Sequence, residues 1–344
     1  MAARQLGADP WELRRRNFIR KFPHRTATGS RYDVGDFARV LARARSEADA
    51  EGFGLRREKA AKAGKHRGMG IAYYIESILG DRKEAADIAF EADGSVSLMV
   101  GTQSNGQGHE TVYAQFLSDR TGIPVERISI VQGDSDRIEW GGGTGGSRSV
   151  TVQSNATLGT VTQMIAAMTP FVAAELGVAE ADVAFDDGAF RAKGANRFLT
   201  VMDVADRARV AGRADLLRHR AMKTLPARSF PNGCHVAEVE VDDATGQVSV
   251  MRYTVTDDFG NLMHPTLVEG QIHGGVAQGI GQALMEDAVY DASGQLLTAT
   301  FMDYAMPRAE DVPLVAFTTE STPSTTNVFG MKGCGEAGTV GALA

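Results

Sequence analysis

Residues Cys234–Val255, CHVAEVEVDDATGQVSVMRYTV, decide the fold class of this chain. Apolar and polar side chains alternate on both sides of the turn Asp243–Gly246, and this period of two predicts a pair of half-buried antiparallel strands. Similar β-rich segments lie upstream at Gly70–Glu76, Ala86–Glu91 and Ser95–Val100. Helical segments accompany these strands, so the sequence predicts an α+β fold.

The length of 344 residues exceeds that of one typical domain and predicts two lobes, each with its own core. We expect each lobe to be a mostly antiparallel sheet covered by helices. The charged, helical residues 1–66 show no core of their own and are interpreted as the tail of a preceding domain. Residues 67–227 form the first predicted lobe, and residues 228–344 form the second.

Composition limits the classes of partner. A net charge of −7 argues against nucleic acid. No apolar run approaches the roughly 20 residues that span a bilayer, and no signal peptide opens the chain, so we expect no membrane span and a cytoplasmic location. The two cysteines, Cys234 and Cys334, are too few and too far apart for a zinc site, an iron–sulfur cluster or a disulfide framework. No metal ligated by side chains is therefore predicted.

The 39 glycines cluster where polar residues also cluster. The first cluster, Gly101–Glu110 (GTQSNGQGHE), follows a predicted strand and precedes a predicted helix over 111–121. A strand, a glycine loop and a helix N-terminus together can hold an oxyanion, because the unpaired N–H groups point to one place. Gln107 and His109 add side-chain donors and acceptors. A metalloprotease motif is excluded, because Tyr113 stands where the second histidine would lie.

The second cluster, Trp140–Ser149 (WGGGTGGSRS), precedes a long predicted helix over 151–172. It contains a formal G-x-G-x-x-G match, but no βαβ unit surrounds it, so a dinucleotide-binding fold is disfavoured. A mobile surface loop is the alternative. Ser147 and Arg148 would again lie at a helix N-terminus.

The third cluster is a predicted helix over 266–286 that contains five glycines. Each glycine costs roughly 1 kcal/mol in a helix interior, so we expect something to pack close to this backbone. Gln271 and Gln278 are seven residues apart and share one face. Tight packing of the helix on a sheet is the alternative, although it would not explain the glutamines.

The fourth cluster, Gly330–Gly338 (GMKGCGEAG), holds a single carboxylate, Glu336, in a glycine-rich turn. Glycines allow left-handed backbone and a close approach by a bulky ligand. A carboxylate fixed in such a loop suits a general base. A flexible linker with a solvated glutamate is the alternative for this segment taken alone.

Taken in order, the four clusters resemble the molybdopterin-binding part of the xanthine dehydrogenase family. They are most similar to the large chains of carbon monoxide dehydrogenase-type molybdenum hydroxylases. The likeness covers nearly the whole chain, and four spaced motifs are more specific than any one of them. The matching stretches are Gly106–Glu110, Gly145–Arg148, Gly270–Gly279 and Lys332–Gly338.

The resemblance implies roles for these residues. Glu336 would be the general base beside the molybdenum. The other residues would contact the pterin, its dithiolene, or the phosphates and cytosine nucleotide of the cofactor. The implied cofactor-binding residues are Gly106, Gln107, Gly108, His109, Gly145, Gly146, Ser147, Arg148, Gln271, Gln278, Lys332, Gly333, Cys334 and Gly335.

The resemblance also implies a reaction and partners. The reaction would be oxidation of carbon monoxide, an aldehyde or an N-heterocycle, with water as the oxygen source. The cofactor would be molybdopterin cytosine dinucleotide, whose sulfurs rather than side chains hold the molybdenum. The implied partners are an iron–sulfur subunit, an FAD subunit, a chain that supplies the first half of the molybdopterin domain, and a small-molecule substrate.

This chain departs from the family in length. Large chains of the family are much longer, and their first half carries another glycine-rich loop, a glutamine near the metal and the substrate-selecting loop. We therefore expect either a naturally split subunit or a truncated fragment, with no turnover by this chain alone. A non-catalytic cofactor-binding or assembly protein is the alternative from another functional class.

Overall fold

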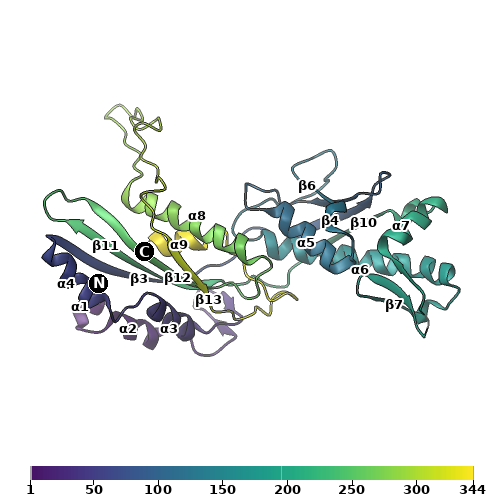
Figure 1. Ribbon diagram of the computed structural model, residues 1–344, viewed down its shortest axis with the longest axis horizontal. Helices are drawn as coiled ribbons and strands as arrows, with labels where there is room; N and C mark the ends of the chain where they lie inside the picture. Colours follow the sequence, from purple (N-terminus) through teal and green to yellow (C-terminus); the bar gives the residue numbers. More distant parts are fainter. Residues whose placement is uncertain (1, 195, 344) are drawn as a thin grey trace. The chain divides into compact units, whose positions relative to one another are not determined.

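The structure is a computed structural model that describes residues 2–194 and 196–343. The chain divides into two compact units. Unit 1 comprises Met1–Ile78 and Ser229–Ala344, and unit 2 comprises Leu79–Arg228. Each unit contains a largely antiparallel sheet with helices packed on it (Figure 1). The predicted α+β class with two lobes is confirmed.

The sheet of unit 1 has four strands in the order β13–β12–β11–β3. They are β3 (Lys65–Ile75), β11 (Asn232–Asp242), β12 (Val248–Asp258) and β13 (Val315–Thr319). Strands β11 and β12 form the predicted antiparallel pair, with Val236 opposite Thr254. Strand β3 pairs antiparallel with the other edge of β11, and β13 runs parallel to β12.

The position of β3 sets the boundary between the units. Because β3 hydrogen-bonds to β11 along its whole length, residues 67–78 lie in unit 1, whereas we expected them in the first lobe. The other boundary, after Arg228, lies one residue from the expected one after residue 227. Local sequence does not indicate which strands pair when they are as far apart in the chain as β3 and β11. The sequence therefore could not indicate that residues 67–78 belong to unit 1.

Helices cover both faces of this sheet (Figure 1). One face is covered by α2 (Pro10–Asn17), α3 (Phe37–Glu47) and α4 (Phe53–Lys62), and the other by α8 (Pro265–Leu284) and α9 (Ala337–Leu343). The core under the first group consists of Trp11, Val40, Leu41, Ala44, Ala48, Cys234 and Val236. The core under the second group consists of Tyr74, Tyr253, Val255, Phe259, Ile272, Val276, Ile280 and Ala337.

The N-terminal residues therefore take part in the core of unit 1. They showed no complete core of their own in the sequence because their apolar side chains share one core with Cys234 and Val236 of β11. Asp9 caps α2 as its sequence suggests, accepting from the backbone N–H of Trp11 at 2.7 Å. The remaining short elements of this segment are α1 (Ala2–Leu6), β1 (His24–Arg25) and β2 (Arg31–Tyr32).

Three of the five glycines in α8 are explained by close packing. A Cβ added at Gly275 would lie 3.0 Å from Cα of Gly338 on α9, and one added at Gly279 would collide with Ala342. A Cβ at Gly281 would lie 2.6 Å from Cγ of Pro307. The expected close approach to this helix is thus made by the same chain. Gly270 and Gly274, in contrast, have open space where a Cβ would be.

Neighbouring glycines of α8 should respond oppositely to alanine. We expect Gly274→Ala to stabilise unit 1 by up to about 1 kcal/mol, because alanine favours the helix. Gly275→Ala gains the same propensity but presses on the α9 backbone, and such overpacking costs about 1–3 kcal/mol. Urea unfolding of both variants checks the difference. Equal stabilities would show that α9 does not pack against α8 as described.

The main sheet of unit 2 has the strand order β10–β4–β5–β6. Its strands are β4 (Lys83–Phe90), β5 (Val96–Val100), β6 (Ile128–Val131) and β10 (Arg218–Thr224). Strand β4 is antiparallel to both β5 and β10, and β6 is parallel to β5. The helices α5 (His109–Thr121) and α6 (Ser149–Leu176) begin directly after the two glycine-rich loops, as predicted.

A smaller antiparallel sheet completes unit 2. It contains a hairpin that turns around Asp186–Gly188 and a third strand. Its elements and the helix beside it are β7 (Val183–Asp186), β8 (Ala189–Ala192), β9 (Phe198–Thr200) and α7 (Val201–Val210).

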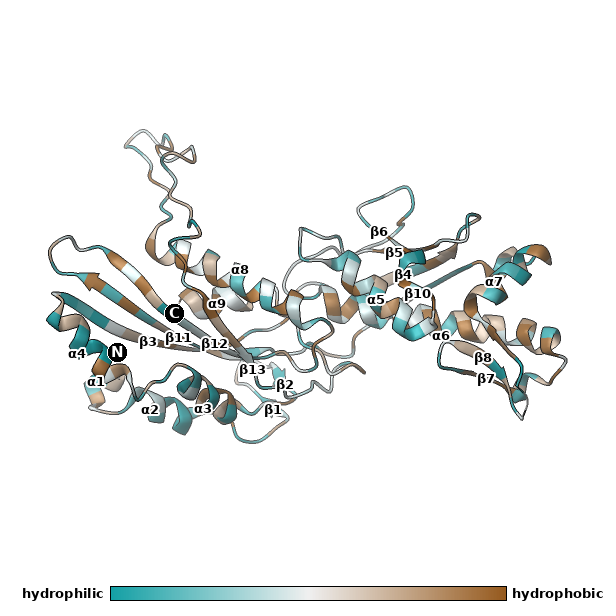
Figure 2. Ribbon diagram, in the orientation of Figure 1, coloured by the Kyte–Doolittle hydropathy of each residue, from teal (hydrophilic) through white to brown (hydrophobic). Residues whose placement is uncertain are grey.

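Helix α6 is the only helix in the described residues that is long and apolar enough to cross a membrane by length and composition. Figure 2 shows its hydrophobic residues interspersed with hydrophilic ones. Gln153 and Thr160 are fully buried and donate to the β4 carbonyl oxygens of Ala85 and Ala86, at 3.0 and 2.9 Å. These contacts identify α6 as a core helix that packs on β4 and β10.

Candidate functional site

The first glycine-rich loop of unit 2 ends at the start of α5. Gly108 is the N-cap of this helix, with φ of 78°, and no side chain caps the helix. A left-handed φ of this size favours glycine. The N–H groups of the first turn therefore have no partner inside the helix and remain available to an anion.

His109 and Gln107 form a fixed pair at this helix start. His109 Nδ1 lies 3.2 Å from the carbonyl oxygen of Thr102, which can only accept, so Nδ1 carries the proton. Nε2 then accepts from Nε2 of Gln107 at 3.2 Å. Gln107 is in turn held by the backbone N–H of Asn105, which donates to its Oε1. Burial lowers the pKa of His109, so its ring is neutral at physiological pH.

The buried histidines of unit 2 should make its stability depend on pH. Burial lowers the pKa of both His109 and His219 in the folded state. The unfolded state therefore binds more protons below a pH of about 6.5, and stability present above that pH is lost as the pH falls. We expect His109→Gln to flatten the fall in unfolding free energy between about pH 7.5 and 5.5.

Urea unfolding at several pH values measures this slope, and His66→Gln, at an exposed histidine, is the control. An unchanged slope in His109→Gln would contradict the role given to burial.

The second glycine-rich loop is joined to the first by direct hydrogen bonds. The N–H of Gly143 donates to the carbonyl of Gly101 at 3.2 Å, and the hydroxyl of Thr144 donates to the carbonyl of Gln103 at 2.6 Å. The structure thus joins the two glycine-rich loops, Gly101–Glu110 and Trp140–Ser149, within unit 2. Helix α6, like α5, begins without a side-chain cap.

Arg148 holds the second loop in place from inside. Its side chain is 2% exposed, and Nη1 lies 2.9 Å from Oε2 of the fully buried Glu84. Its other N–H groups donate to the carbonyls of Asp81, Lys83 and Gly143. The sequence prediction gave Arg148 a direct cofactor contact, whereas the structure shows its guanidinium fully engaged within unit 2. Glu84 was missed, because Lys83 and Asp87 in the same strand made a further charged residue inconspicuous.

The loop glycines fall into two groups. A Cβ at Gly146 would collide with Leu79, whose N–H donates to the Gly146 carbonyl at 2.7 Å, so this glycine serves packing. Gly106, Gly143 and Gly145 have no atom within 4 Å of an added Cβ. Ser147, which follows Gly146 and lies two residues before the first residue of α6, takes a left-handed φ of 56°.

The donor set of these loops fits an anionic cofactor rich in hydrogen-bonding groups. Two uncapped helix starts supply N–H groups, three glycines leave the backbone open, and Gln107 adds an oriented amide. Backbone N–H groups at helix starts favour phosphates. A pterin with a phosphate-linked nucleotide offers the complementary acceptors and donors.

In unit 1, the predicted glutamines lie on α8 beside α9. Gln278 Oε1 accepts from the hydroxyl of Thr339 at 3.3 Å, and the same hydroxyl donates to the carbonyl of Gly275 at 3.0 Å. Gln278 is exposed and Gln271 is half-buried, and both can present amide groups at the helix surface. The structure thus brings the third and fourth glycine clusters together within unit 1.

Glu336 is exposed at the start of α9. Its backbone carbonyl accepts from the N–H groups of Thr339 and Val340 at 3.1 and 3.2 Å, so it occupies the N-cap position of that helix. Gly335 beside it is exposed and Gly333 is buried. The carboxylate is therefore carried by a short ordered helix rather than by a free linker.

Two other residues of this loop face inward. Lys332 is 2% exposed, and its Nζ lies 2.7 Å from Oδ2 of the fully buried Asp258. The Cys334 side chain packs against the second core, and burial raises the pKa of its thiol to about 12. The thiol therefore stays protonated at neutral pH and is a weak ligand or nucleophile. Both residues were predicted to contact the cofactor.

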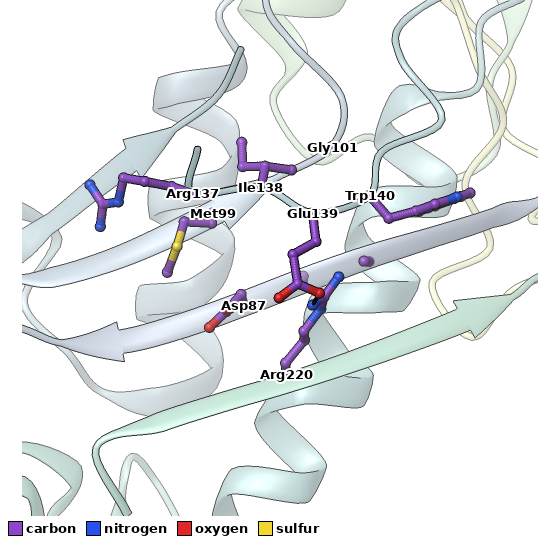
Figure 3. A pocket seen from close by; sticks show the side chains of 10 residues that line it. Asp87, Met99, Gly101, Arg137, Ile138, Glu139, Trp140 and Arg220 are labelled. Carbon is purple, nitrogen blue, oxygen red and sulfur yellow. Dashed lines mark hydrogen bonds and ion pairs between the residues drawn. The ribbon is translucent and has the colours of Figure 1, made fainter. Parts of the chain in front are cut away.

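A shallow pocket also lies in unit 2 between β4, β10 and the loop before the second glycine cluster (Figure 3). Glu139 and Arg220 in its wall form an ion pair, and Asp87 pairs with Arg218 at 2.6 Å. Arg137, which also lines the pocket, pairs with Glu91 at 3.0 Å. Each charged group of the lining thus has an ion-pair partner, and we assign the pocket no part in cofactor binding.

Comparison with known proteins places the chain in a family. The sequence profile described as "Molybdopterin cofactor-binding domain" matches residues 43–313. The chain belongs to this family. The resemblance inferred from the four clusters is thereby confirmed.

Relatives of the molybdopterin cofactor-binding family match nearly the whole chain. The nicotine 6-hydroxylase large subunit of Paenarthrobacter nicotinovorans is 34% identical over 99% of this chain and 44% of its own length. The carbon monoxide dehydrogenase large chain of Hydrogenophaga pseudoflava is 33% identical over 99% of this chain and 45% of its own length. The crystal structure of quinoline 2-oxidoreductase from Pseudomonas putida 86 matches this chain with a TM-score of 0.91 and 30% sequence identity. The match covers 99% of this chain and 46% of that structure's chain. The chain thus spans less than half the length of these relatives.

Proposed function

We propose that this chain is the molybdopterin-binding part of a molybdenum hydroxylase or dehydrogenase. The substrate would be carbon monoxide, an aldehyde or an N-heterocycle, with water as the oxygen source. The observation that carries the proposal is the match of 99% of the chain to large chains named for carbon monoxide and nicotine oxidation. The open glycine loops of unit 2 and the exposed Glu336 of unit 1 support it.

The residues of unit 2 would bind the cofactor. The N–H groups at the starts of α5 and α6 would hold its phosphates, beside the open backbone at Gly106 and Gly145. Gln107 would donate to or accept from the pterin, and neutral His109 would keep Gln107 oriented. Gly108 and Ser147 would shape the two loops around the cofactor. Arg148 and Gly146 would act indirectly, by holding the second loop.

The residues of unit 1 would bind the cofactor and move a proton. Gln271 and Gln278 would present amide groups from α8, and Gly333 and Gly335 would let the loop backbone approach the cofactor. Glu336 would take a proton, at a carboxylate oxygen, from the water that supplies the oxygen atom. When bound, the cofactor supplies a molybdenum centre that accepts the two electrons removed from the substrate.

The complete enzyme would contain further chains. We propose molybdopterin cytosine dinucleotide as the cofactor form and a cytoplasmic location. Electrons would pass to an iron–sulfur subunit and an FAD subunit, and another chain would supply the first half of the molybdopterin domain. The chain alone would then show no turnover.

Tagged purification from the organism that encodes the chain tests the proposal. We expect about one molybdenum per chain, together with pterin, cytosine nucleotide, iron and FAD. Mass spectrometry should identify co-purifying chains that carry the missing half and the electron-transfer groups. A chain that purifies without molybdenum and without pterin would overturn the proposal.

A further inference from the structure

The loop that carries Glu336 contains a fully buried ion pair. The side chains of Lys332 and Asp258 are each 0% exposed, and Nζ lies 2.7 Å from Oδ2. Burying two charges costs several kcal/mol per ion unless they pair well and further hydrogen bonds satisfy them. Such a pair requires an explanation beyond simple packing.

The Asp258 carboxylate is satisfied by groups from separate segments. Its Oδ1 accepts from the N–H groups of Gly260 at 3.0 Å and Thr322 at 2.9 Å. Its Oδ2 accepts from Asn232 Nδ2 at 3.2 Å as well as from Lys332. The carboxylate therefore joins β11, the end of β12, the segment after β13 and the Glu336 loop.

The backbone before Glu336 is held at the same place. The N–H of Lys332 donates to the carbonyl of Phe259 at 2.8 Å. Asn327 donates to the carbonyl of Met331 at 2.8 Å and accepts from its N–H at 3.1 Å. The backbone after Glu336 is held by α9, whose Gly338 lies against α8.

Only three residues, 333–335, separate this anchored backbone from Glu336. Two of them are glycines, which by themselves would leave the carboxylate poorly placed. The Lys332 side chain points into unit 1 and is shielded from solvent, and its ammonium group forms an ion pair with Asp258.

We propose that the Lys332–Asp258 ion pair positions Glu336, so that Lys332 is a positioning residue and not a cofactor ligand. The inference rests on the proposed function, in which Glu336 is the base. The pair fixes the loop from one side while α9 fixes it from the other. Displacement of a catalytic group by about 1 Å can cost 10²-fold in rate, so such an anchor has a direct catalytic effect.

Hydrogen exchange of the full chain, without cofactor, tests the anchor. We expect Lys332→Met to speed amide exchange in peptides covering 330–337 by about tenfold or more, because Asp258 loses its counter-charge and the loop opens. The double variant Lys332→Met/Asp258→Asn removes both charges and keeps an acceptor for Gly260 and Thr322, so exchange should slow again. Lys65→Met, at a half-exposed lysine of the same unit, is the control.

Kinetics of the assembled complex test the effect on Glu336. We expect Lys332→Met to lower kcat by about tenfold to 10²-fold with molybdenum content retained and KM little changed. The double variant should recover part of kcat. If Lys332→Met does not fold, the double variant alone decides, through the same exchange and kcat measurements.

Two outcomes would overturn the inference. One is unchanged exchange at 330–337 together with loss of molybdenum or pterin from Lys332→Met, which would make Lys332 a cofactor ligand. The other is faster exchange with kcat unchanged. Because exchange is measured on the chain alone, its result does not depend on whether the wild-type complex hydroxylates any substrate.

Discussion

Replacing Glu336 by glutamine should lower kcat of the assembled complex by about 10²- to 10⁴-fold, the range that general-base catalysis supplies. Glutamine keeps the shape of the side chain but cannot take up a proton. The backbone carbonyl of residue 336 still caps α9, so the helix start is preserved. Steady-state kinetics, with molybdenum content measured on the same preparation, gives the result.

Glu310→Gln is the matched control, because Glu310 lies in the same unit and its side chain is 77% exposed. We expect this variant to have wild-type kinetics. A Glu336→Gln complex that retains its molybdenum and more than half of its activity would show that Glu336 is not the base.

Replacing Arg148 by methionine should destabilise unit 2 by about 3–5 kcal/mol, because it leaves the charge of Glu84 buried and unpaired. The same change removes the hydrogen bonds to the carbonyls of Asp81, Lys83 and Gly143. The second glycine-rich loop would then lose its internal support. Urea unfolding, followed by circular dichroism, measures the loss.

Arg220→Met is the control for this prediction, since Arg220 forms a more exposed ion pair with Glu139 in the same unit. Such pairs contribute roughly 0–1 kcal/mol. The double variant Arg148→Met/Glu84→Gln should recover part of the stability, because no unpaired charge remains. If Arg148→Met costs no more than Arg220→Met, the guanidinium is not the internal support of the loop.

Much of the fold could be predicted from the sequence because the alternation of apolar residues and the turn residues between strands were clear. The alternation in β11 and β12 and the turn between them predicted that hairpin. The edge strand β10, RHRAMKT, was missed, because exposed edge strands carry charged side chains and lose the apolar signal. The pairing of β3 with β11 was also hidden, since no local pattern specifies a partner so distant in sequence.

The candidate site was predicted unevenly for a related reason. Glycines and glutamines marked the loops, since loops that expose backbone need particular residues. The orientation of a charged side chain depends on a partner elsewhere in the chain. The inward orientation of Arg148 and Lys332 therefore could not be predicted from the sequence around them. Their partners Glu84 and Asp258 are fully buried strand residues, and acids are seldom fully buried unless they are paired.

The insertion of unit 2 between the two parts of unit 1 constrains how the protein is made. A ribosome completes Leu79–Arg228 before it adds Asn232–Asp242, the strand that lies between β3 and β12. The apolar side chains of α2, α3 and β3 therefore remain without their packing partners on β11 while unit 2 is synthesised. Nascent chains expose such surfaces to aggregation and to chaperones. The order of elements along the chain thus makes unit 1, which carries Glu336, the later of the two units to close.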